Sequence, residues 1–452
     1  MITVFAQQIS RRALIGGAAA VGAAFLAGCG KDEQGPSRGS SGEGVLNVWG
    51  ALTLDRGVGA LLDAFKKEHP GIQVNYTQFT NNSDGNLKLD TSLQGGAPVD
   101  VFFSYGPQAV SRRTAAGYAM DLTDLAAGDD VAKQFTGTDP QLTALFDGRL
   151  FAIPTVYNPY MVYLNQDLLD AAGITVPEDW TVQEFHDIAK ELCGGAYAEF
   201  ATYKTLAVAT MGLGGDAQVS ADGTSSNFGH ELWRRQYELE LEMERDGTLF
   251  PITRVLAEKV DLYAQSYFLS GDHAFYLDNP ATLRFVKDQE NYPHDFRTTF
   301  RPMPYLERGQ QQWNQGGYED SVQISAKTKY PEAAWTFVQY WLGAGAEQLL
   351  TAGKISPAVV PAPDAGADAL LPGLLGDERD DLFDVEAFTR VAFAEDMKLS
   401  VTTHTAGLSE IGTIRKSLDE QLRLGEIDVD ELLTQLEEQA DAAIAKDLET
   451  NA

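Results

Sequence analysis

The pattern of hydrophobic and polar positions alternates between strand-type and helical spacing from residue 45 onward. Strand-type apolar runs cover residues 45–49, 72–76 and 99–103. Residues 58–65 place their apolar side chains on one face of a helix, and residues 87–93 carry a second helical pattern. This order of strand, helix, strand, helix and strand predicts a parallel sheet that is covered by helices.

Two extended runs in the next part of the chain contain prolines. They cover residues 151–153 and 160–164, and Pro154 and Pro159 interrupt them. Because proline lacks a backbone N–H, we expect the strand to break at each proline.

Helices dominate the rest of the chain. Thr181 and Glu184 have the spacing of a capping box and predict the start of a helix. Residues 332–342 form another helical pattern, and two apolar stripes separated by Gly425 predict a pair of helices at the end. The fold class is therefore α/β, and a chain of 452 residues is long enough for two or more domains.

The first residues have the layout of an export signal. Arg11 and Arg12 precede an apolar run over residues 13–27, which Gly28 and Cys29 follow. The run has about fifteen residues, whereas a membrane-spanning helix needs roughly twenty, so a permanent transmembrane anchor fits poorly. We expect a signal peptide over residues 1–28.

Residues 26–29 resemble the lipobox of bacterial lipoproteins, which implies that the mature chain begins at a lipidated Cys29. Residues 10–14 resemble a twin-arginine export signal, although two arginines also suit the general secretory route. Residues 29–44 are rich in Gly, Ser and charge, and they predict a flexible tether.

Cysteine content and charge narrow the class of protein. Once Cys29 carries lipid, only Cys193 remains, so no intrachain disulfide can form and a large core must supply stability. We expect Cys193 to be a buried apolar residue. The formal net charge of -31 disfavours binding to nucleic acid.

Specific catalytic and metal motifs are absent from the sequence. It contains no GxSxG, HExxH, GxxxxGK[ST] or CxxC pattern, and its six histidines show no helical metal-ligand spacing. We therefore expect no cofactor and no metal site. A carboxylate pair of a glycan hydrolase could still lie among the 65 acidic residues, so a lipid-anchored extracellular hydrolase remains an alternative.

Aromatic and amide side chains gather where the predicted strands end. Trp49 and Tyr105 follow two of the strands, residues 157–160 lie in the proline-containing run, and residues 313–318 include Trp313, Asn314 and Tyr318. Ligands of open α/β sheets bind beyond the carboxyl ends of strands. Aromatic faces pack on sugar rings and amides bind hydroxyls, so these residues indicate a neutral polyol site. Packing at strand ends is the alternative explanation for each of them.

Five segments, taken in order, resemble the maltose-binding-like group of extracellular solute-binding proteins of ABC importers. They are VLNVWG from Val45, LLDAFKKEHPGIQV from Leu61, GGAPVDVFFS from Gly95, DGRLFAIPTVYNPYMVYLNQDLL from Asp147 and GGYEDSVQISAKTKYPEAAWTFVQYWL from Gly316. The resemblance implies a binding protein and not an enzyme. It implies a type II periplasmic-binding-protein fold, with two discontinuous α/β lobes joined by a hinge.

The resemblance also implies lobe bounds and a mechanism. Lobe 1 would contain residues 45–157 and 305–342, and lobe 2 would contain residues 158–304 and 343–452. A ligand held between the lobes would shift an open-closed equilibrium, and the closed form would dock on the permease.

Ligand contacts follow from the strand-end pattern and from the resemblance together. The expected residues are Trp49, Tyr105, Asn158, Tyr160, Tyr203, Asp278, Asn279, Trp313, Tyr318 and His404. Asn158 stands where the family often has an acid, and Ala281 and residues 403–405 lack the tryptophans of some members. We therefore expect a cleft that does not grip long maltose-type chains in the same way.

The expected partners are a mono- or oligosaccharide, the permease subunits and, through lipid on Cys29, the outer face of the cytoplasmic membrane. We expect a monomer. The same fold could instead bind a polyamine, a phosphorylated polyol or a metal chelate. Few basic residues cluster in the sequence, which argues against phosphate, and the acidic charge mildly favours a cation.

Overall fold

The computed structural model describes residues 43–129, 144–146, 148–260, 264–359, 367–377, 379–401 and 406–451. The chain divides into two compact units, Met1–Ser37 and Arg38–Ala452, and everything described below belongs to the second. The predicted signal peptide, Cys29 and His404 lie outside the described residues. Among the helices that are described, none is both long and apolar enough to cross a membrane.

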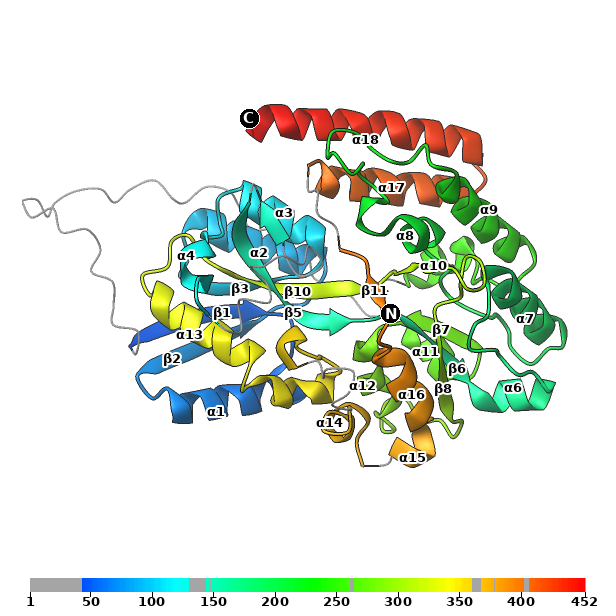
Figure 1. Ribbon diagram of the computed structural model, residues 1–452, viewed down its shortest axis with the longest axis horizontal. Helices are drawn as coiled ribbons and strands as arrows, with labels where there is room; N and C mark the ends of the chain where they lie inside the picture. Colours follow the sequence, from blue (N-terminus) through cyan, green and yellow to red (C-terminus); the bar gives the residue numbers. More distant parts are fainter. Residues whose placement is uncertain are drawn as a thin grey trace, which may run out of the picture. The chain divides into compact units, whose positions relative to one another are not determined.

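A six-stranded sheet is built mainly from the first part of the chain (Figure 1). Its strands stand in the order β2-β1-β3-β10-β5-β4. Their bounds are β1 (Gly44–Gly50), β2 (Ile72–Gln78), β3 (Val101–Ser104), β4 (Ala144–Phe146), β5 (Arg149–Asn158) and β10 (Gly317–Ile324). β1 pairs in parallel with β2 and β3, which confirms the predicted parallel sheet, and β10 pairs antiparallel with β3 and β5.

Helices cover both faces of this sheet. They are α1 (Gly59–Glu68), α2 (Ser83–Gly95), α3 (Pro107–Ala115), α4 (Thr123–Ala126) and α13 (Pro331–Leu342). Alternate residues of β1 point to opposite faces: Leu46 and Val48 join a core with α1 and α13, whereas Trp49 packs with residues of α2. The predicted helix over residues 332–342 is confirmed by α13.

β5 differs from the prediction, because it continues through Pro154 and ends only at Asn158. β4 pairs with β5 only as far as Ala152. Beyond that point no named strand of the described residues pairs with β5 on the β4 side, where only an isolated bridge joins Tyr157 to Ile355, and an edge is where a strand tolerates a proline. The expected break at Pro154 was therefore wrong, and only Pro159 and Tyr160 separate β5 from the next strand.

A three-stranded antiparallel sheet forms the centre of the second region. Its order is β7-β6-β8, with β6 (Met161–Asn165), β7 (Phe275–Asp278) and β8 (Thr298–Pro302). The helices of the remaining chain are α6 (Gln166–Ala172), α7 (Val182–Gly194), α8 (Val208–Leu213), α9 (Glu231–Arg245), α10 (Ile252–Glu258), α11 (Gln265–Leu269), α12 (Leu283–Val286), α14 (Leu371–Leu375), α15 (Arg379–Leu382), α16 (Val385–Ala392), α17 (Leu408–Arg423) and α18 (Val429–Asn451). The chain also has five short helical turns and two short strands. They are η1 (Leu54–Val58), η2 (Gly214–Asp216), η3 (Pro280–Thr282), η4 (Ala346–Ala352), η5 (Pro357–Val359), β9 (Trp313–Asn314) and β11 (Lys398–Leu399).

The capping box of α7 is confirmed. The Thr181 backbone N–H donates to Glu184 Oε2 at 2.7 Å, and the Glu184 N–H donates to Thr181 Oγ1 at 3.3 Å. Cys193 near the end of this helix is half-buried and not fully buried as expected. Burial raises the pKa of its thiol to about 11, which leaves it unreactive.

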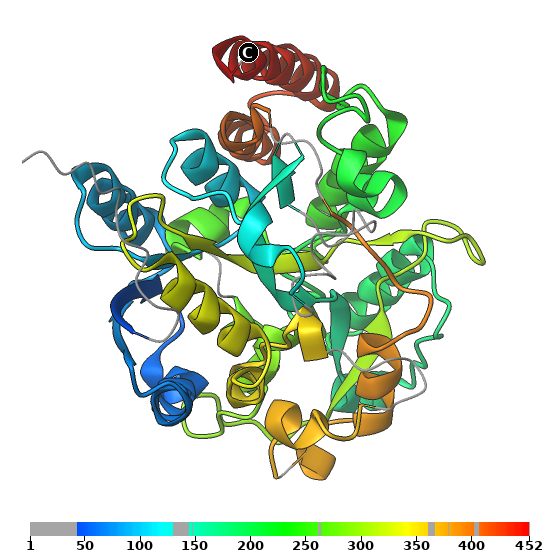
Figure 2. The same ribbon diagram turned by 60° about the vertical axis from the view of Figure 1, so that its left-hand side comes forward.

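The two predicted helices at the end of the chain are α17 and α18. Together with α9 they bury one apolar cluster of their own. α17 also lies beside α3, so the end of the chain contacts a helix of the six-stranded sheet (Figure 2).

The chain passes between the two sheets more than once. β5 leads into β6 across residues 159–160, and the chain returns from β8 to β10 across residues 303–316. β5 and β10 extend from the six-stranded sheet toward the three-stranded sheet (Figure 1). The lobe bounds stay a prediction; Leu306, just after the predicted boundary at residue 305, packs with the core around β6.

Candidate ligand-binding site

A cavity of about 450 Å³ lies at the carboxyl ends of β1, β2 and β3. The first region contributes Ala51, Leu52, Thr53, Arg56, Gln78, Phe79, Thr80, Asn81 and Tyr105. The second region contributes Gln265, Arg284, Phe285 and Tyr292, and Asp320 and Lys354 complete the lining. This is the position at which open α/β sheets bind ligands.

Tyr105 fixes the wall formed by the strand ends. Its hydroxyl accepts a hydrogen bond from the Ala51 N–H at 2.5 Å, and its ring centroid lies 5.9 Å from that of Phe79. Burial is the main cause that raises the pKa of the phenol above its usual value, so the hydroxyl stays neutral. The residues that follow β1, β2 and β3 are thereby held together as one surface.

Arg56 projects from η1, which Gly57 anchors. Gly57 has φ +90°, and a Cβ at this position would lie 1.9 Å from the Gln348 carbonyl oxygen in η4. Only glycine allows this close approach with this backbone conformation. The Arg56 guanidinium carbon lies 5.3 Å from the ring centroid of Phe285, which belongs to the second region.

Phe285 is the centre of the opposite wall. The Arg284 guanidinium carbon lies 4.4 Å from its ring centroid, and the ring of Tyr292 meets it edge-on at 5.6 Å. Gln265 is only 5% exposed and donates from Nε2 to the Tyr292 hydroxyl at 3.1 Å. Its Oε1 accepts no hydrogen bond from any residue that the structure describes.

An ion pair closes the cavity near β10. Lys354 Nζ lies 2.5 Å from Asp320 Oδ2, and the two side chains are 12% and 13% exposed. Asp320 has φ +52°, an unusual backbone conformation for a residue other than glycine. This pair neutralises the acid that lines the cavity.

Asn158 lies at the end of β5, close to a carboxylate. It is 2% exposed, and its Nδ2 donates to Glu319 Oε2 at 2.8 Å. Its Oδ1 has no hydrogen-bond partner in the described part of the chain. Burial, followed by the charge of Asp320, raises the pKa of Glu319. The acid that the sequence lacked at residue 158 is therefore present beside it, on β10.

Tyr160, Asp278 and Asn279 lie near Asn158. Burial and the charges of Asp278 and Glu319 raise the pKa of Tyr160, so these groups share one environment. Asp278 accepts hydrogen bonds from the Asn279 N–H at 2.9 Å and from the Thr282 hydroxyl at 2.7 Å. Asn279 Oδ1 caps η3 by accepting from the Ala281 N–H. Local bonds thus hold both side chains.

The other predicted aromatic residues pack against neighbours. Trp49 lies under Lys88, Trp313 lies against Gly214 and under Lys398, Tyr318 contacts Tyr157, and Tyr203 contacts Phe250. Of the ten residues predicted as ligand contacts, Tyr105 alone lines the 450 Å³ cavity, among the residues the structure describes. The remaining assignments stay predictions.

Sequence reasoning missed most of the cavity lining. Residues 78–81 follow the second strand, and the strand-end rule that selected Trp49 and Tyr105 would have found them. Arg284, Phe285 and Lys354 carry no such signal, since they come from distant segments that only the fold brings together.

Comparisons with known proteins decide the family. The family model for "Bacterial extracellular solute-binding protein" matches residues 52–348, more than half of the chain. The chain belongs to this family. Its members are non-enzymatic binding proteins, so the hydrolase alternative is excluded. No curated protein sequence matches this solute-binding protein.

Solved structures share its fold over most of the chain. An ABC substrate-binding protein from Listeria monocytogenes in complex with cycloalternan is 18% identical, with a TM-score of 0.70 over 89% of this chain and 99% of that one. A sugar transporter from Rhizobium etli in an open conformation is 16% identical, with a TM-score of 0.68 over 88% and 99%. The sugar-binding protein MalE from Xanthomonas citri is 19% identical, with a TM-score of 0.65 over 89% and 98%. The predicted periplasmic-binding-protein fold is confirmed.

The solute-binding protein has a second cavity, of about 490 Å³, on the side of the three-stranded sheet. Two of its lining arginines form ion pairs with lining acids: Arg308 with Asp179, and Arg390 with Glu178 at 2.6 Å.

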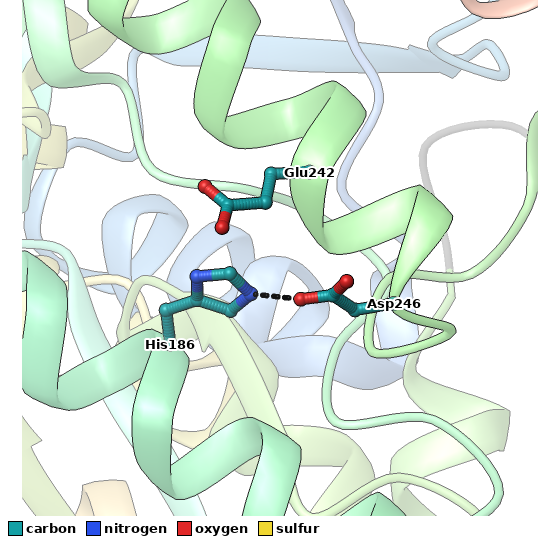
Figure 3. A group of neighbouring side chains, drawn as sticks. All are labelled: His186, Glu242 and Asp246. Carbon is teal, nitrogen blue, oxygen red and sulfur yellow. Dashed lines mark ion pairs between the residues drawn. The ribbon is translucent and has the colours of Figure 1, made fainter.

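One group of side chains in the solute-binding protein has donors suited to a cation (Figure 3). His186 on α7 is 2% exposed, and its Nε2 lies 3.1 Å from Oδ2 of Asp246, which directly follows α9. With Glu242 the three residues can offer ligand atoms within 4.8 Å of one another. The spacing of histidines in the sequence gives no sign of this group, because its two carboxylates lie on or directly after another helix, α9. The His186–Asp246 contact links α7 to α9.

Proposed function

We propose that this protein is a lipid-anchored extracellular receptor that captures a carbohydrate and delivers it to an ABC importer. The observation that carries the proposal is the 450 Å³ cavity, whose aromatic rings and amides come from both sheet regions. Phe79, Tyr105, Phe285 and Tyr292 offer ring faces and edges for apolar sugar surfaces. Gln78, Asn81 and Gln265 offer amides for hydroxyl groups.

The family and the fold support this proposal. A solute-binding protein of this family needs a site between two walls, and the cavity has walls from residues 51–105 and from residues 265–292. Structures with the same fold include proteins solved with cycloalternan and with raffinose. A volume of about 450 Å³ suits a ligand of one to three sugar rings, within the usual range of small-molecule sites.

The mechanism is closure of two lobes around the ligand. β5 and β10 form the main connection, so rotation at residues 159–160 and 303–316 moves one wall against the other. A ligand that contacts both walls binds the closed form more tightly and shifts the equilibrium toward it. The permease then recognises the closed form.

A binding assay tests the carbohydrate assignment. We expect at least one mono- or oligosaccharide of a broad panel, tested at millimolar concentration, to raise the melting temperature, since a ligand that binds only the folded state stabilises it. Isothermal titration should give heat for the same sugar, and chromatography should recover that sugar unchanged. Tyr105→Ala should weaken binding, whereas Tyr197→Ala, at an exposed residue, should not. If no sugar gives a shift or heat, the carbohydrate assignment fails.

The lipid anchor is a separate part of the proposal. A receptor must stay near its permease, and lipid on Cys29 would hold it at the outer face of the cytoplasmic membrane. One acyl chain binds a membrane only marginally, so stable retention would need two or three. Cys29→Ala should release a folded, ligand-binding chain from the membrane fraction. Retention of that variant on membranes would contradict lipidation at Cys29. Exchange of Arg11 and Arg12 for lysine should block export if the route is twin-arginine.

A further inference from the structure

Two acidic side chains stand together at the end of α9. Glu242 and Asp246 are four residues apart, so they lie on the same face of the helix. Like charges at this spacing repel each other, and the carboxyl end of a helix also disfavours negative charge. No lysine or arginine in the described part of the chain forms an ion pair with either acid. A cation between the two carboxylates would therefore stabilise this end of α9.

His186 reaches the same place from α7. Its side chain is only 2% exposed. Its Nε2 lies 3.1 Å from Asp246 Oδ2, yet this nitrogen has no hydrogen-bond partner among the described residues. The contact thus has the distance of a hydrogen bond without its direction. A buried ring nitrogen without a hydrogen bond is costly unless another group binds it.

The three side chains can offer their ligand atoms to a single ion. Figure 3 shows both carboxylates beside the imidazole ring, and one atom from each residue lies within 4.8 Å of the other two. In a tetrahedron, two ligands that each lie about 2.1 Å from a zinc ion are about 3.4 Å apart, which is close to the 3.1 Å between Nε2 and Oδ2. Glu242 and Asp246 are exposed, so an ion can enter from solvent and a water molecule can complete the coordination.

From this arrangement we infer that His186, Glu242 and Asp246 form a binding site for a divalent transition-metal ion, with zinc as the expected occupant. The imidazole nitrogen favours zinc over calcium and magnesium, which prefer oxygen ligands. Two carboxylates balance the charge of the ion, and the bound ion fastens α7 to the end of α9. None of the three residues lines the 450 Å³ cavity, so this inference is independent of the proposed carbohydrate function.

Calorimetry on the full chain tests the site with zinc chloride alone. The protein is first treated with a chelator, which is then removed by dialysis. We expect one equivalent of zinc to bind with micromolar or tighter affinity and to raise the melting temperature, because the ion binds the folded state. Calcium and magnesium should bind at least about tenfold more weakly than zinc. No sugar is present, so the result does not depend on the carbohydrate assignment.

Variants locate the ion. Glu242→Gln removes a ligand at an exposed position and keeps the shape of the side chain, so the fold should persist while zinc binds at least about tenfold more weakly. His186→Gln should weaken zinc binding to a similar extent. Glu238→Gln, one turn earlier on the same face of α9, is the matched control and should leave zinc binding unchanged. Circular dichroism in the presence of the chelator checks that each variant is folded.

Three results would overturn the inference. The first is a wild-type chain that binds no zinc. The second is equal zinc affinity in Glu242→Gln and Glu238→Gln, which would mean that zinc binds elsewhere on the acidic surface. The third is calcium binding as tight as zinc binding, which would remove the imidazole from the set of ligands. Each of these results leaves the carbohydrate function standing, because sugar binding is measured separately.

Discussion

His273 makes the stability of this protein depend on pH in a way that can be calculated from the structure. The imidazole is completely buried, and neither of its nitrogens has a hydrogen-bond partner among the described residues. It is surrounded by the rings of Phe200, Phe250 and Tyr267, at centroid distances of 5.9, 5.5 and 5.3 Å. Burial lowers the pKa of His273 from 6.5 to about 4. Asp272 opposes this shift and Arg254 adds to it.

The sign follows from which state binds the proton. The unfolded chain takes up a proton on His273 near pH 6.5, whereas the folded chain does not until about pH 4. The contribution to stability is therefore full above pH 6.5 and is lost as the pH falls toward 4. Proton linkage gives a loss of roughly 1–2 kcal/mol at pH 5.5 and roughly 2–3 kcal/mol at pH 4.5.

Urea unfolding of the wild-type chain and of His273→Phe measures this loss. Phenylalanine has a similar shape, fits the aromatic surroundings and cannot take up a proton. Many carboxylates also titrate below pH 5, so the informative quantity is the difference between the two proteins. Between pH 7.5 and 5.5 the wild-type chain should lose roughly 1–2 kcal/mol more than His273→Phe. Equal losses would refute the assignment of a depressed pKa to this histidine.

Two further predictions concern the cavity and its supports, and a third concerns the cap of α7. Gly57→Ala places a Cβ 1.9 Å from the Gln348 carbonyl oxygen at φ +90°. The variant should therefore lower the free energy of unfolding by roughly 2–4 kcal/mol, as measured by urea unfolding. A loss below about 0.5 kcal/mol would contradict this account. Lys354→Met leaves the Asp320 carboxylate buried without its partner and should lower the free energy of unfolding by about 3 kcal/mol. The double variant Lys354→Met with Asp320→Asn should recover most of this stability. If it recovers none, the two residues are not coupled. Thr181→Ala removes the side-chain half of the capping box of α7. It should destabilise the folded protein by about 1 kcal/mol and lower its melting temperature. An unchanged melting temperature would count against the cap.

Local features were the ones that could be predicted from the sequence. The strands and helices between residues 44 and 104, the capping box and α13 were predicted because neighbouring side chains determine them. The prediction for β5 was wrong at Pro154, because whether a strand tolerates a proline depends on which strand pairs beside it. The extent of pairing between β4 and β5 is set by the fold and not by neighbouring residues, so a strand pattern in the sequence cannot show where the sheet edge begins.

The site was harder to predict because its residues come from seven separate parts of the chain. Tyr105 followed from the rule about strand ends, and residues 78–81 would have followed from the same rule. Arg56 and Arg284 are separated by more than two hundred residues, and neither belongs to a basic cluster in the sequence. The mild preference for a cation among the alternative ligands came from an average over the whole surface, whereas a ligand responds to the few charges within a Debye length.

The η4 segment connects the two walls of the cavity, and this limits how the walls can move. On one side, Gly57 allows η1 to approach the Gln348 carbonyl oxygen of η4. On the other side, Gly353 directly follows η4, and a Cβ there would lie 2.1 Å from the carbonyl oxygen of Pro280 in η3. Arg56 directly precedes Gly57 and Arg284 lies four residues after Pro280, so each arginine belongs to a wall that touches the same segment. η4 thus contacts both walls through glycine positions that admit no side chain. A ligand that contacts both walls would act on the backbone of this one short segment, which links ligand binding to lobe closure.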